Sequence, residues 1–299
     1  MILDLVTKIV PFLILTYIGG NCQDFGYDGD EGPVHWGEKY SQCLGKHQSP
    51  IDIETSNVLM KNFPPLKFEH FQHEVHEGLL ENNGHTVILK IIRGKRPRIQ
   101  GGPLKGIYEF SQLHFHWGPN DTLGSENKIN HQSFPLEMHV VMHNIAYGPH
   151  KAAKIYGGLT VLSFLTSISP NDNKNYDKLE EGLLEVQFVS SNKSIRNFGS
   201  LDNLTTVDRK HYFTYEGSLT TPPCSEVVTW IEFVNTVPLS KEQIKAFRSI
   251  STTGGRLTHN FRPVQPINDR FVYYNSGISH SKTTITVLYV ILVFLLINT

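Results

Sequence analysis

The stretch Gln112-Leu113-His114-Phe115-His116-Trp117-Gly118 places two histidines two positions apart within a run of strand-forming residues. Side chains two positions apart on a strand point to the same face, so His114 and His116 can bind one ion side by side. Phe115 then points to the opposite face, into a core. Residues 112–117 therefore predict a strand that carries two ligands of a metal site.

A second segment, Glu137-Met138-His139-Val140-Val141-Met142-His143, places Glu137, His139, Val141 and His143 on one face of another predicted strand. If the two strands are neighbours, either His139 or His143 completes a three-histidine site, and periodicity does not choose between them. Three neutral histidines with an open fourth position are typical of catalytic zinc, whereas structural zinc sites are closed and rich in cysteine.

The composition is that of a chain with a packed core. Of the 299 residues, 39% are hydrophobic and 18% charged, which excludes a disordered or fibrous protein. Lys and Arg number 27 against 28 for Asp and Glu, so no broad positive field favours nucleic acid as a partner. The 15 histidines are a high count and point to metal chemistry.

Short apolar or alternating segments, separated by Gly, Pro and Asn, predict a domain built mainly from strands. The predicted strands are 85–92, 112–117, 136–143, 159–166, 227–234 and 269–274. Helical patterns are few, and each begins near an Asp or Ser that can cap it, at 177–184 and 240–247. The sequence shows no internal repeat and no linker, so we expect a single, mainly β domain with short peripheral helices.

The first 22 residues have the pattern of a secretory signal peptide. Lys8 precedes an apolar run over 9–18, and Gly19 and Gly20 follow it. The run is shorter than the roughly 20 apolar residues that span a bilayer; a buried N-terminal strand is the alternative. Cleavage fits after Gly20 or after Cys22, and the second leaves an even number of cysteines, as an oxidising compartment favours.

The C-terminal segment has the pattern of a glycolipid (GPI) anchor signal. The small residues Asn275, Ser276 and Gly277 precede a short polar spacer and an apolar run over 285–297. This predicts a mature domain over 23–275, a propeptide over 276–299, and attachment to the extracellular face of the plasma membrane through Asn275 or Ser276. A short transmembrane helix is the alternative.

Three N-x-Ser/Thr triplets are candidate glycosylation sites, at Asn120, Asn192 and Asn203. Such triplets carry meaning only on a secreted chain, because the modifying enzymes act in the secretory pathway. Each is weak by itself, since the pattern is short enough to arise by chance. Together with the signal pattern they predict a glycoprotein.

The chain resembles the α-class carbonic anhydrases, of the secreted, membrane-anchored kind, from about residue 25 to 273. The resemblance rests on motifs that occur together and in order, at 48–53, 83–85, 112–118, 124–126, 137–139, 215–223 and 260–263. It implies a single-domain, mainly β fold with a twisted, mostly antiparallel ten-stranded sheet. It also implies a zinc ion at the base of a central cone.

The implied activity is the reversible hydration of CO2 to bicarbonate and a proton. His114, His116 and His139 match the zinc ligands of the family, so the resemblance selects His139 over His143. Zinc lowers the pKa of its bound water, to about 7 in carbonic anhydrases themselves, and the resulting hydroxide attacks CO2. A catalytically silent binding module on the same fold is the alternative, and relatives of that kind have lost a zinc histidine.

Other roles follow from the same resemblance. Thr220 matches the threonine that accepts the hydroxide's proton in a hydrogen bond and donates its own to Glu126. His85 matches the histidine that carries the proton to solvent, and Tyr27 and Asn83 match residues along the proton path. Gln112 and Glu137 match residues that orient the zinc ligands. The residues that match the substrate pocket are Val141, Val161, Leu219, Thr221, Val228 and Trp230.

The resemblance to secreted members also implies a Cys43–Cys224 disulfide and inhibition by sulfonamides. Three places depart from the family pattern. Ile88 stands where a polar residue often lines the water chain, Phe25 stands where a tryptophan is usual, and Met142-His143 replaces a pair that is usually His-Trp. These departures bear on the rate of proton transfer and leave the zinc site intact.

Overall fold

The computed structural model describes residues 25–277. The predicted signal peptide, 1–22, and residues 278–299 of the predicted propeptide lie outside this range. Within the described range, no helix is long and apolar enough to cross a bilayer.

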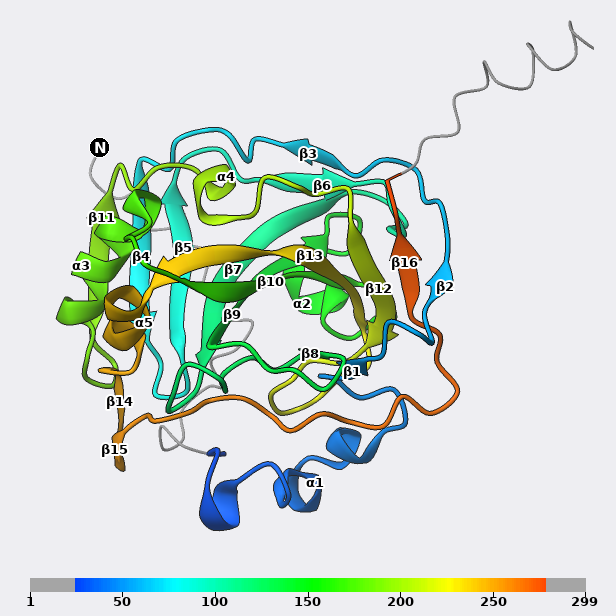
Figure 1. The fold of residues 1–299 in the computed structure, drawn as a ribbon, viewed down its shortest axis with the longest axis horizontal. Helices are drawn as coiled ribbons and strands as arrows, with labels where there is room; N and C mark the ends of the chain where they lie inside the picture. Colours follow the sequence, from blue (N-terminus) through cyan, green and yellow to red (C-terminus); the bar gives the residue numbers. More distant parts are fainter. Residues whose placement is uncertain (1–24, 278–299) are drawn as a thin grey trace, which may run out of the picture.

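The strands are longest at the centre of the molecule (Figure 1). The central ones are β5 (Val87–Arg93), β7 (Tyr108–Trp117), β9 (Leu136–Asn144), β10 (Leu159–Ser169), β12 (Tyr212–Gly217) and β13 (Val228–Ser240). The outer ones are β2 (Leu59–Met60), β3 (Lys67–Glu69), β4 (Glu77–Asn82), β6 (Arg98–Gln100), β11 (Asn192–Arg196) and β16 (Tyr273–Asn275). Two small separate pairs are β1 (Asp52–Ile53) with β8 (Lys128–Ile129), and β14 (Ser251–Thr252) with β15 (Gly255–Arg256).

One large sheet joins twelve strands of the described chain. Ten follow a single path, β11-β4-β5-β7-β9-β10-β13-β12-β16-β2, and the pair β3–β6 branches from it beside β7. Its neighbours are antiparallel except for β10 with β13 and β16 with β2. The expected twisted, mostly antiparallel sheet is therefore confirmed, but it has twelve strands where ten were expected, because the pair β3–β6 joins the ten-stranded path.

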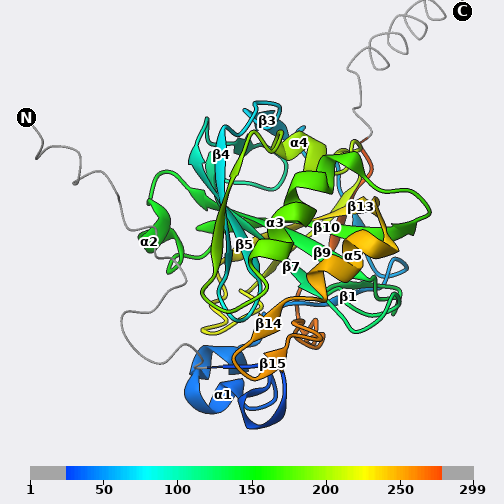
Figure 2. The same ribbon diagram turned by 90° about the vertical axis from the view of Figure 1, so that its left-hand side faces the viewer.

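Short helices lie outside the sheet, and the two predicted ones are among them. They are α1 (Trp36–Lys39), α2 (Pro149–Ala152), α3 (Asp177–Glu185), α4 (Leu201–Leu204), α5 (Lys241–Phe247) and the 3-10 turns η1 (Gly29–Glu31), η2 (Ser41–Leu44) and η3 (Lys174–Tyr176). Figure 2 shows α3 and α5 side by side. Helix α5 begins where predicted, because Ser240 Oγ accepts from the Gln243 N–H at 3.2 Å and the Gln243 side chain accepts from the Ser240 N–H.

One strand prediction needs correction. Residues 269–274 were expected to form a strand throughout, but β16 begins only at Tyr273. A turn occupies residues 268–269, with Asn268 at φ 53°, and the Arg270 N–H bonds to the carbonyl of Ile267. The alternation of apolar residues is therefore carried by a turn and a loop before the strand starts.

The sheet packs against a core on each face. Phe115 belongs to the larger core and contacts Phe247 of α5, with ring centroids 4.7 Å apart. Val141, Val161 and Trp230 belong to a second, smaller core. Strand β9 is buried at all of its positions, as expected for a central strand covered on both faces. The prediction that Phe115 points away from the two histidines is confirmed.

Covalent and backbone features hold the chain near Thr220. Cys43 and Cys224 form a disulfide that links the N-terminal segment to the loop after β12, with Cα atoms 4.9 Å apart. The expected pairing is therefore confirmed. The peptide bonds Pro222–Pro223 and Ser49–Pro50 are cis, and the Ser49 N–H donates to Ser218 Oγ at 2.9 Å in the same region.

Candidate metal centre

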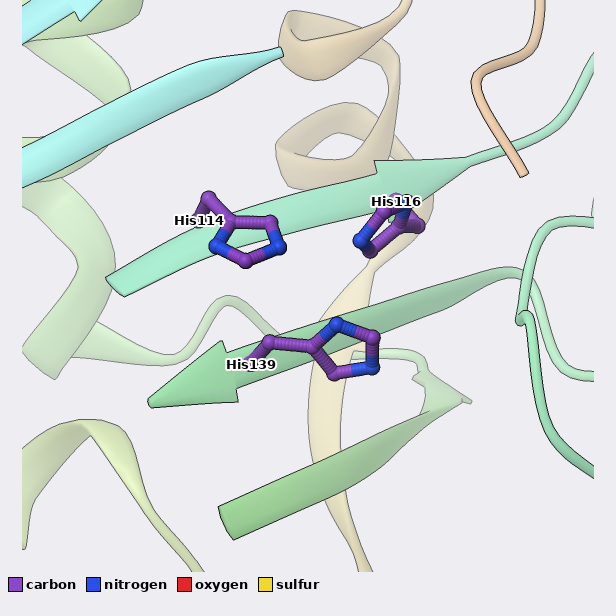
Figure 3. A group of neighbouring side chains, drawn as sticks. All are labelled: His114, His116 and His139. Carbon is purple, nitrogen blue, oxygen red and sulfur yellow. The ribbon is translucent and has the colours of Figure 1, made fainter. Parts of the chain in front are cut away.

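Three histidine side chains converge on the face of the sheet that carries the smaller core (Figure 3). His114 and His116 lie on β7, and the register of β7 and β9 places His139 directly opposite His114. One ligand nitrogen of each ring lies within 4.8 Å of the others. His116 and His139 are each only 1% exposed, whereas His114 is partly accessible.

His143, the alternative third ligand on the same face of β9, is not part of this cluster. Its Nδ1 lies 2.8 Å from the hydroxyl of Ser111, the residue at which β7 bulges. Since β9 continues beyond the point opposite His114, His143 lies opposite Glu109 instead. The described structure therefore selects His139, which periodicity left open.

A protein acceptor occupies the other ring nitrogen of each histidine. His114 Nδ1 donates to Gln112 Oε1 at 3.0 Å, and His116 Nδ1 donates to the carbonyl oxygen of Asn260 at 2.7 Å. His139 differs, because its Nε2 donates to Glu137 Oε1 at 2.7 Å. The nitrogens left to coordinate a metal are therefore Nε2 of His114, Nε2 of His116 and Nδ1 of His139.

The electrostatics of the cluster suit a cation. Burial, together with the neighbouring histidines, holds the pKa of His114 well below its usual value and lowers that of His116 to about 3, so both rings are neutral and can coordinate. His116 Nε2 is buried, has no hydrogen-bond partner among residues 25–277, and lies 3.3 Å from Glu126 Oε2. When Glu126 is ionised, both atoms are acceptors, and two acceptors this close in a dry site are tolerated best when a positive charge lies beside them.

Glu137 is held by five hydrogen bonds. Its Oε1 accepts from His139, from Ser163 Oγ at 2.6 Å and from Asn127 Nδ2 at 2.8 Å. Its Oε2 accepts from the backbone N–H groups of Glu126 and Asn127 at 2.7 and 2.8 Å. Burial acts to raise the pKa of Glu137, but His139 and these donors outweigh it and lower that pKa. An ionised, immobile carboxylate therefore orients the His139 ring.

Glu126 lies next to His116, and Thr220 lies next to Glu126. Thr220 is buried and close enough to Glu126 to act as a hydrogen-bond donor, which lowers the pKa of the carboxyl. Burial and Glu137 act more strongly and raise that pKa well above its usual value. Glu126 Oε1 accepts from the backbone N–H of Arg262 at 2.8 Å, whereas no described group meets full hydrogen-bond geometry at Oε2.

The predicted apolar pocket residues form one group next to the histidines. Val141, Val161, Val228 and Trp230 are buried in the smaller core, and Leu219 packs against them while partly exposed. The Trp230 and His139 rings lie 4.9 Å apart, and Trp230 Nε1 donates to the carbonyl of Ser218 in the loop before Thr220. The apolar group therefore reaches the metal cluster.

His85 is half-buried and stacks face to face on Phe25, with centroids 3.9 Å apart and an interplanar angle of 9°. Asn83 Oδ1 accepts from the backbone N–H groups of His85 and Thr86, so this side chain builds the turn before β5. Tyr27 is buried, and burial followed by the charge of Glu126 raises its pKa well above the usual value. The substitution of Phe25 for a tryptophan thus preserves an aromatic surface beside His85.

Sequence reasoning assigned no role to Arg262, Asn260 or Asn127, although the first two lie in a motif that supported the resemblance. Arg262 Nη1 donates to Gln48 Oε1 and to the carbonyl of Ser49, and Nη2 donates to the carbonyl of Cys43. Asn260 Oδ1 accepts from the Trp117 N–H at 2.7 Å. Such contacts join segments more than 100 residues apart, so no local pattern in the sequence reveals them.

Three imidazoles whose free nitrogens face one another, without a cysteine ligand, define a catalytic type of zinc centre on a mainly β scaffold. The chain belongs to the eukaryotic-type carbonic anhydrase family, whose model matches residues 31–276. Carbonic anhydrases use zinc, and the three-histidine cluster fits such a site.

Similar curated proteins are also carbonic anhydrases. The chain is 36% identical to carbonic anhydrase 7 of Mus musculus over 265 residues, which cover 85% of this chain and 97% of that protein. It is 35% identical to carbonic anhydrase 12 of Homo sapiens, with coverages of 85% and 73%. It is 33% identical to the putative carbonic anhydrase 3 of Caenorhabditis elegans, with coverages of 83% and 95%.

Proposed function

We propose that this protein is a zinc enzyme that catalyses the reversible hydration of CO2 to bicarbonate and a proton at the extracellular face of the plasma membrane. The observation that carries the catalytic part is the convergence of His114, His116 and His139 with one free nitrogen each. Bound zinc would supply a coordinated water molecule of lowered pKa as the source of the nucleophile.

Thr220 and Glu126 would orient the reactant that attacks CO2. Thr220 has a single hydroxyl hydrogen, and Glu126 beside it takes that hydrogen when ionised. The Thr220 oxygen can then only accept, so it favours a reactant that donates a hydrogen bond and directs the lone pair of that reactant toward carbon. The Arg262 backbone N–H holds Glu126 in place from the other side.

The apolar group would hold the substrate. CO2 has no net dipole and accepts hydrogen bonds weakly, so a wall of Val141, Val161, Val228 and Trp230 with Leu219 can hold it without ordering water. Bicarbonate is charged and is solvated more favourably by water than by an apolar wall, so its release is favoured. The family also implies inhibition by sulfonamides at the same metal site.

Stopped-flow measurement of CO2 hydration by purified residues 23–275 tests the catalytic proposal. We expect activity with zinc, loss of that activity after treatment with a zinc chelator, and recovery when zinc is returned, because the metal supplies the nucleophile. Loss and recovery should follow the zinc content measured by atomic absorption. A zinc-loaded, folded protein without hydration activity would instead favour the silent binding module.

His85 is proposed to carry the proton from the metal site to solvent, and its ring is kept in place by Phe25. We expect His85→Ala to lower the maximal hydration rate by about tenfold, less than the roughly 100-fold typical of a positioned acid–base group, because buffer bases partly replace the shuttle. Added imidazole should restore the rate in the variant and leave the wild type almost unchanged. An unchanged rate at low buffer concentration would show that another group carries the proton.

The extracellular location is supported by several independent features. The N- and C-terminal segments have the patterns of a signal peptide and of a lipid-anchor signal. The Cys43–Cys224 disulfide is stable in oxidising compartments. The side chains of Asn120, Asn192 and Asn203 are all exposed, as glycan attachment requires in the folded protein.

Ser276 is the better supported of the two attachment residues. The Asn275 side chain is buried, accepts from the Phe63 N–H at 3.0 Å and donates to the carbonyl of Lys210 at 2.7 Å. The strand therefore uses Asn275 as a structural residue, whereas Ser276 follows β16.

Treatment of cells with a phosphatidylinositol-specific phospholipase C tests the anchor. We expect active enzyme to move from the membrane fraction into the medium, because cleavage of the lipid leaves only the protein and a short glycan. A transmembrane protein of the same cells serves as the control that must stay behind. Retention of the enzyme, with residues 278–299 found in the mature protein, would favour the transmembrane helix.

A further inference from the structure

Glu232 on β13 is a carboxyl group that the proposed mechanism does not use, and it is completely buried at 0% exposure. Its Oε2 accepts a hydrogen bond from Asn127 Nδ2 at 3.1 Å, whereas no described group meets full hydrogen-bond geometry at its Oε1, although the Ser163 hydroxyl lies close enough to lower the pKa of the carboxyl. Burial of a carboxyl with so few partners is unfavourable, so a sheet interior ordinarily holds an apolar residue instead.

The sheet places Glu232 on the same face as His139, two strands away. The antiparallel register of β9 and β10 sets Ser163 opposite His139, and the parallel register of β10 and β13 sets Glu232 opposite Ser163. Side chains at paired positions lie on one face of a sheet. Glu232 therefore shares a face with Ser163, which donates to the Glu137 carboxylate that orients His139.

Asn127 links the two carboxyl groups. Its Nδ2 donates one hydrogen to Glu137 Oε1 at 2.8 Å and the other to Glu232 Oε2 at 3.1 Å. Its Oδ1 accepts from the Ile51 N–H and from the Tyr215 hydroxyl. Because every polar atom of this amide has a partner, Glu232 holds the amide plane in the orientation in which it donates to Glu137.

Of the two carboxyl groups that Asn127 links, Glu137 is the one whose surroundings favour a negative charge. Glu137 receives five hydrogen bonds, whereas Glu232 receives one of full geometry, from Asn127, with the Ser163 hydroxyl close enough to act as a second, weaker donor. Among the described residues, no Lys or Arg forms an ion pair with Glu232. Burial, and next the charge of Glu137, raise the pKa of Glu232 well above its usual value. These effects favour the neutral carboxylic acid, which accepts from Asn127 and adds no second negative charge near His139.

We infer that Glu232 is a positioning residue of the metal centre: as a neutral acceptor it fixes Asn127, which in turn holds the Glu137 carboxylate on His139. The inference rests on the proposed metal site. It extends that site through three hydrogen bonds, His139 to Glu137, Asn127 to Glu137 and Asn127 to Glu232, and so reaches β13, which contributes no metal ligand. It explains why an acid is buried at position 232, where packing alone would favour an apolar side chain.

Three variants test this role. Glu232→Gln keeps a neutral acceptor of the same shape, and Glu232→Met keeps length and volume without an acceptor. Thr160→Val is the matched control, because Thr160 is buried on the opposite face of β10 and donates to the carbonyl of Thr229, remote from Glu137. The measurements are zinc dissociation constants by chelator competition, the visible spectrum of the cobalt-substituted protein, and urea unfolding.

We expect Glu232→Met to weaken zinc binding by about tenfold, the lower end of what residues behind a metal ligand contribute, and to change the cobalt spectrum. Glu232→Gln should stay within about twofold of the wild type. Thr160→Val should unfold at lower urea concentration with zinc affinity and spectrum unchanged. If Glu232→Met does not fold, Glu232→Asp replaces it, since the shortened acid withdraws from Asn127.

Two results would overturn the inference. Wild-type affinity and spectrum in Glu232→Met would show that the residue only fills space. Equal weakening in Glu232→Gln and Glu232→Met would show that the acid itself, rather than a neutral acceptor, is required. A wild-type protein that binds no zinc would refute the metal site as well, so the two failures are distinguishable.

Discussion

Replacement of His114, His116 or His139 by alanine, one at a time, is expected to remove bound zinc and nearly all CO2 hydration activity. Each ring supplies one of three coordinating nitrogens, and its other nitrogen is already held by Gln112, Asn260 or Glu137. Residues behind metal ligands typically contribute about 10- to 100-fold to metal affinity, so loss of a ligand itself should exceed that range. Zinc content by atomic absorption and stopped-flow hydration measure the two effects.

His143→Ala is the matched control for this prediction. His143 is a buried histidine on the same face of β9, but its ring bonds to Ser111 and lies outside the cluster. We expect this variant to keep zinc and most of its activity while losing some stability. Zinc lost in His143→Ala but kept in His139→Ala would show that the wrong histidine has been assigned. Circular dichroism should confirm that every variant retains the sheet.

Removal of the disulfide by the double substitution Cys43→Ser, Cys224→Ser is expected to lower the free energy of unfolding substantially. The bond joins residues 181 positions apart, for which the chain-entropy model gives about 5 kcal/mol, an upper value because measured effects often fall below it. For a domain of this size, such a loss lowers the midpoint of thermal unfolding by about 10 °C. Differential scanning calorimetry of the zinc-loaded protein measures the shift.

Function should respond less than stability to this change. The loop that carries Thr220 keeps other attachments, since Gln48 donates to the carbonyl of Cys224 and Ser49 bonds to Ser218. We therefore expect a modest loss of hydration activity well below the unfolding midpoint and a steep loss as that midpoint is approached. Peptide mapping without reduction is the control for the wild type. Free thiols at Cys43 and Cys224, or an unchanged midpoint in the variant, would contradict the prediction.

The local sequence pattern was sufficient to predict the strands that carry the histidines. A period of two residues predicted strands at 112–117 and 136–143 and put His114 and His116 on one face, and β7 and β9 confirm both. The Ser240 cap likewise predicted α5. Such predictions succeed because side-chain direction along a strand, and the first turn of a helix, depend on neighbouring residues alone. The same reasoning failed at 269–272, where a turn interrupts an alternating segment.

The sequence motifs predicted more of the site than the periodicity of the strands did. The ordered set of motifs led to the carbonic anhydrase family, and thereby to the third histidine and to the Cys43–Cys224 pair, both of which the structure bears out. Periodicity had left His139 and His143 equivalent. The choice comes from strand register, because His114 pairs with His139 across β7 and β9, and the bulge at Ser111 shifts the pairing on the side where His143 lies.

The sequence by itself thus determined the strands, the shared face of His114 and His116, and the family. Only the tertiary structure decided which nitrogen of each ring is free, which donors surround Glu137, and that Glu232 lies two strands from His139 on the same face. The physical reason is that a strand's alternation is set by adjacent residues, whereas register and hydrogen-bond partners are set between segments up to about 200 residues apart. A buried acid at position 232 has no evident role in the sequence, because only the pairing of β13 with β10 and of β10 with β9 sets it in line with His139.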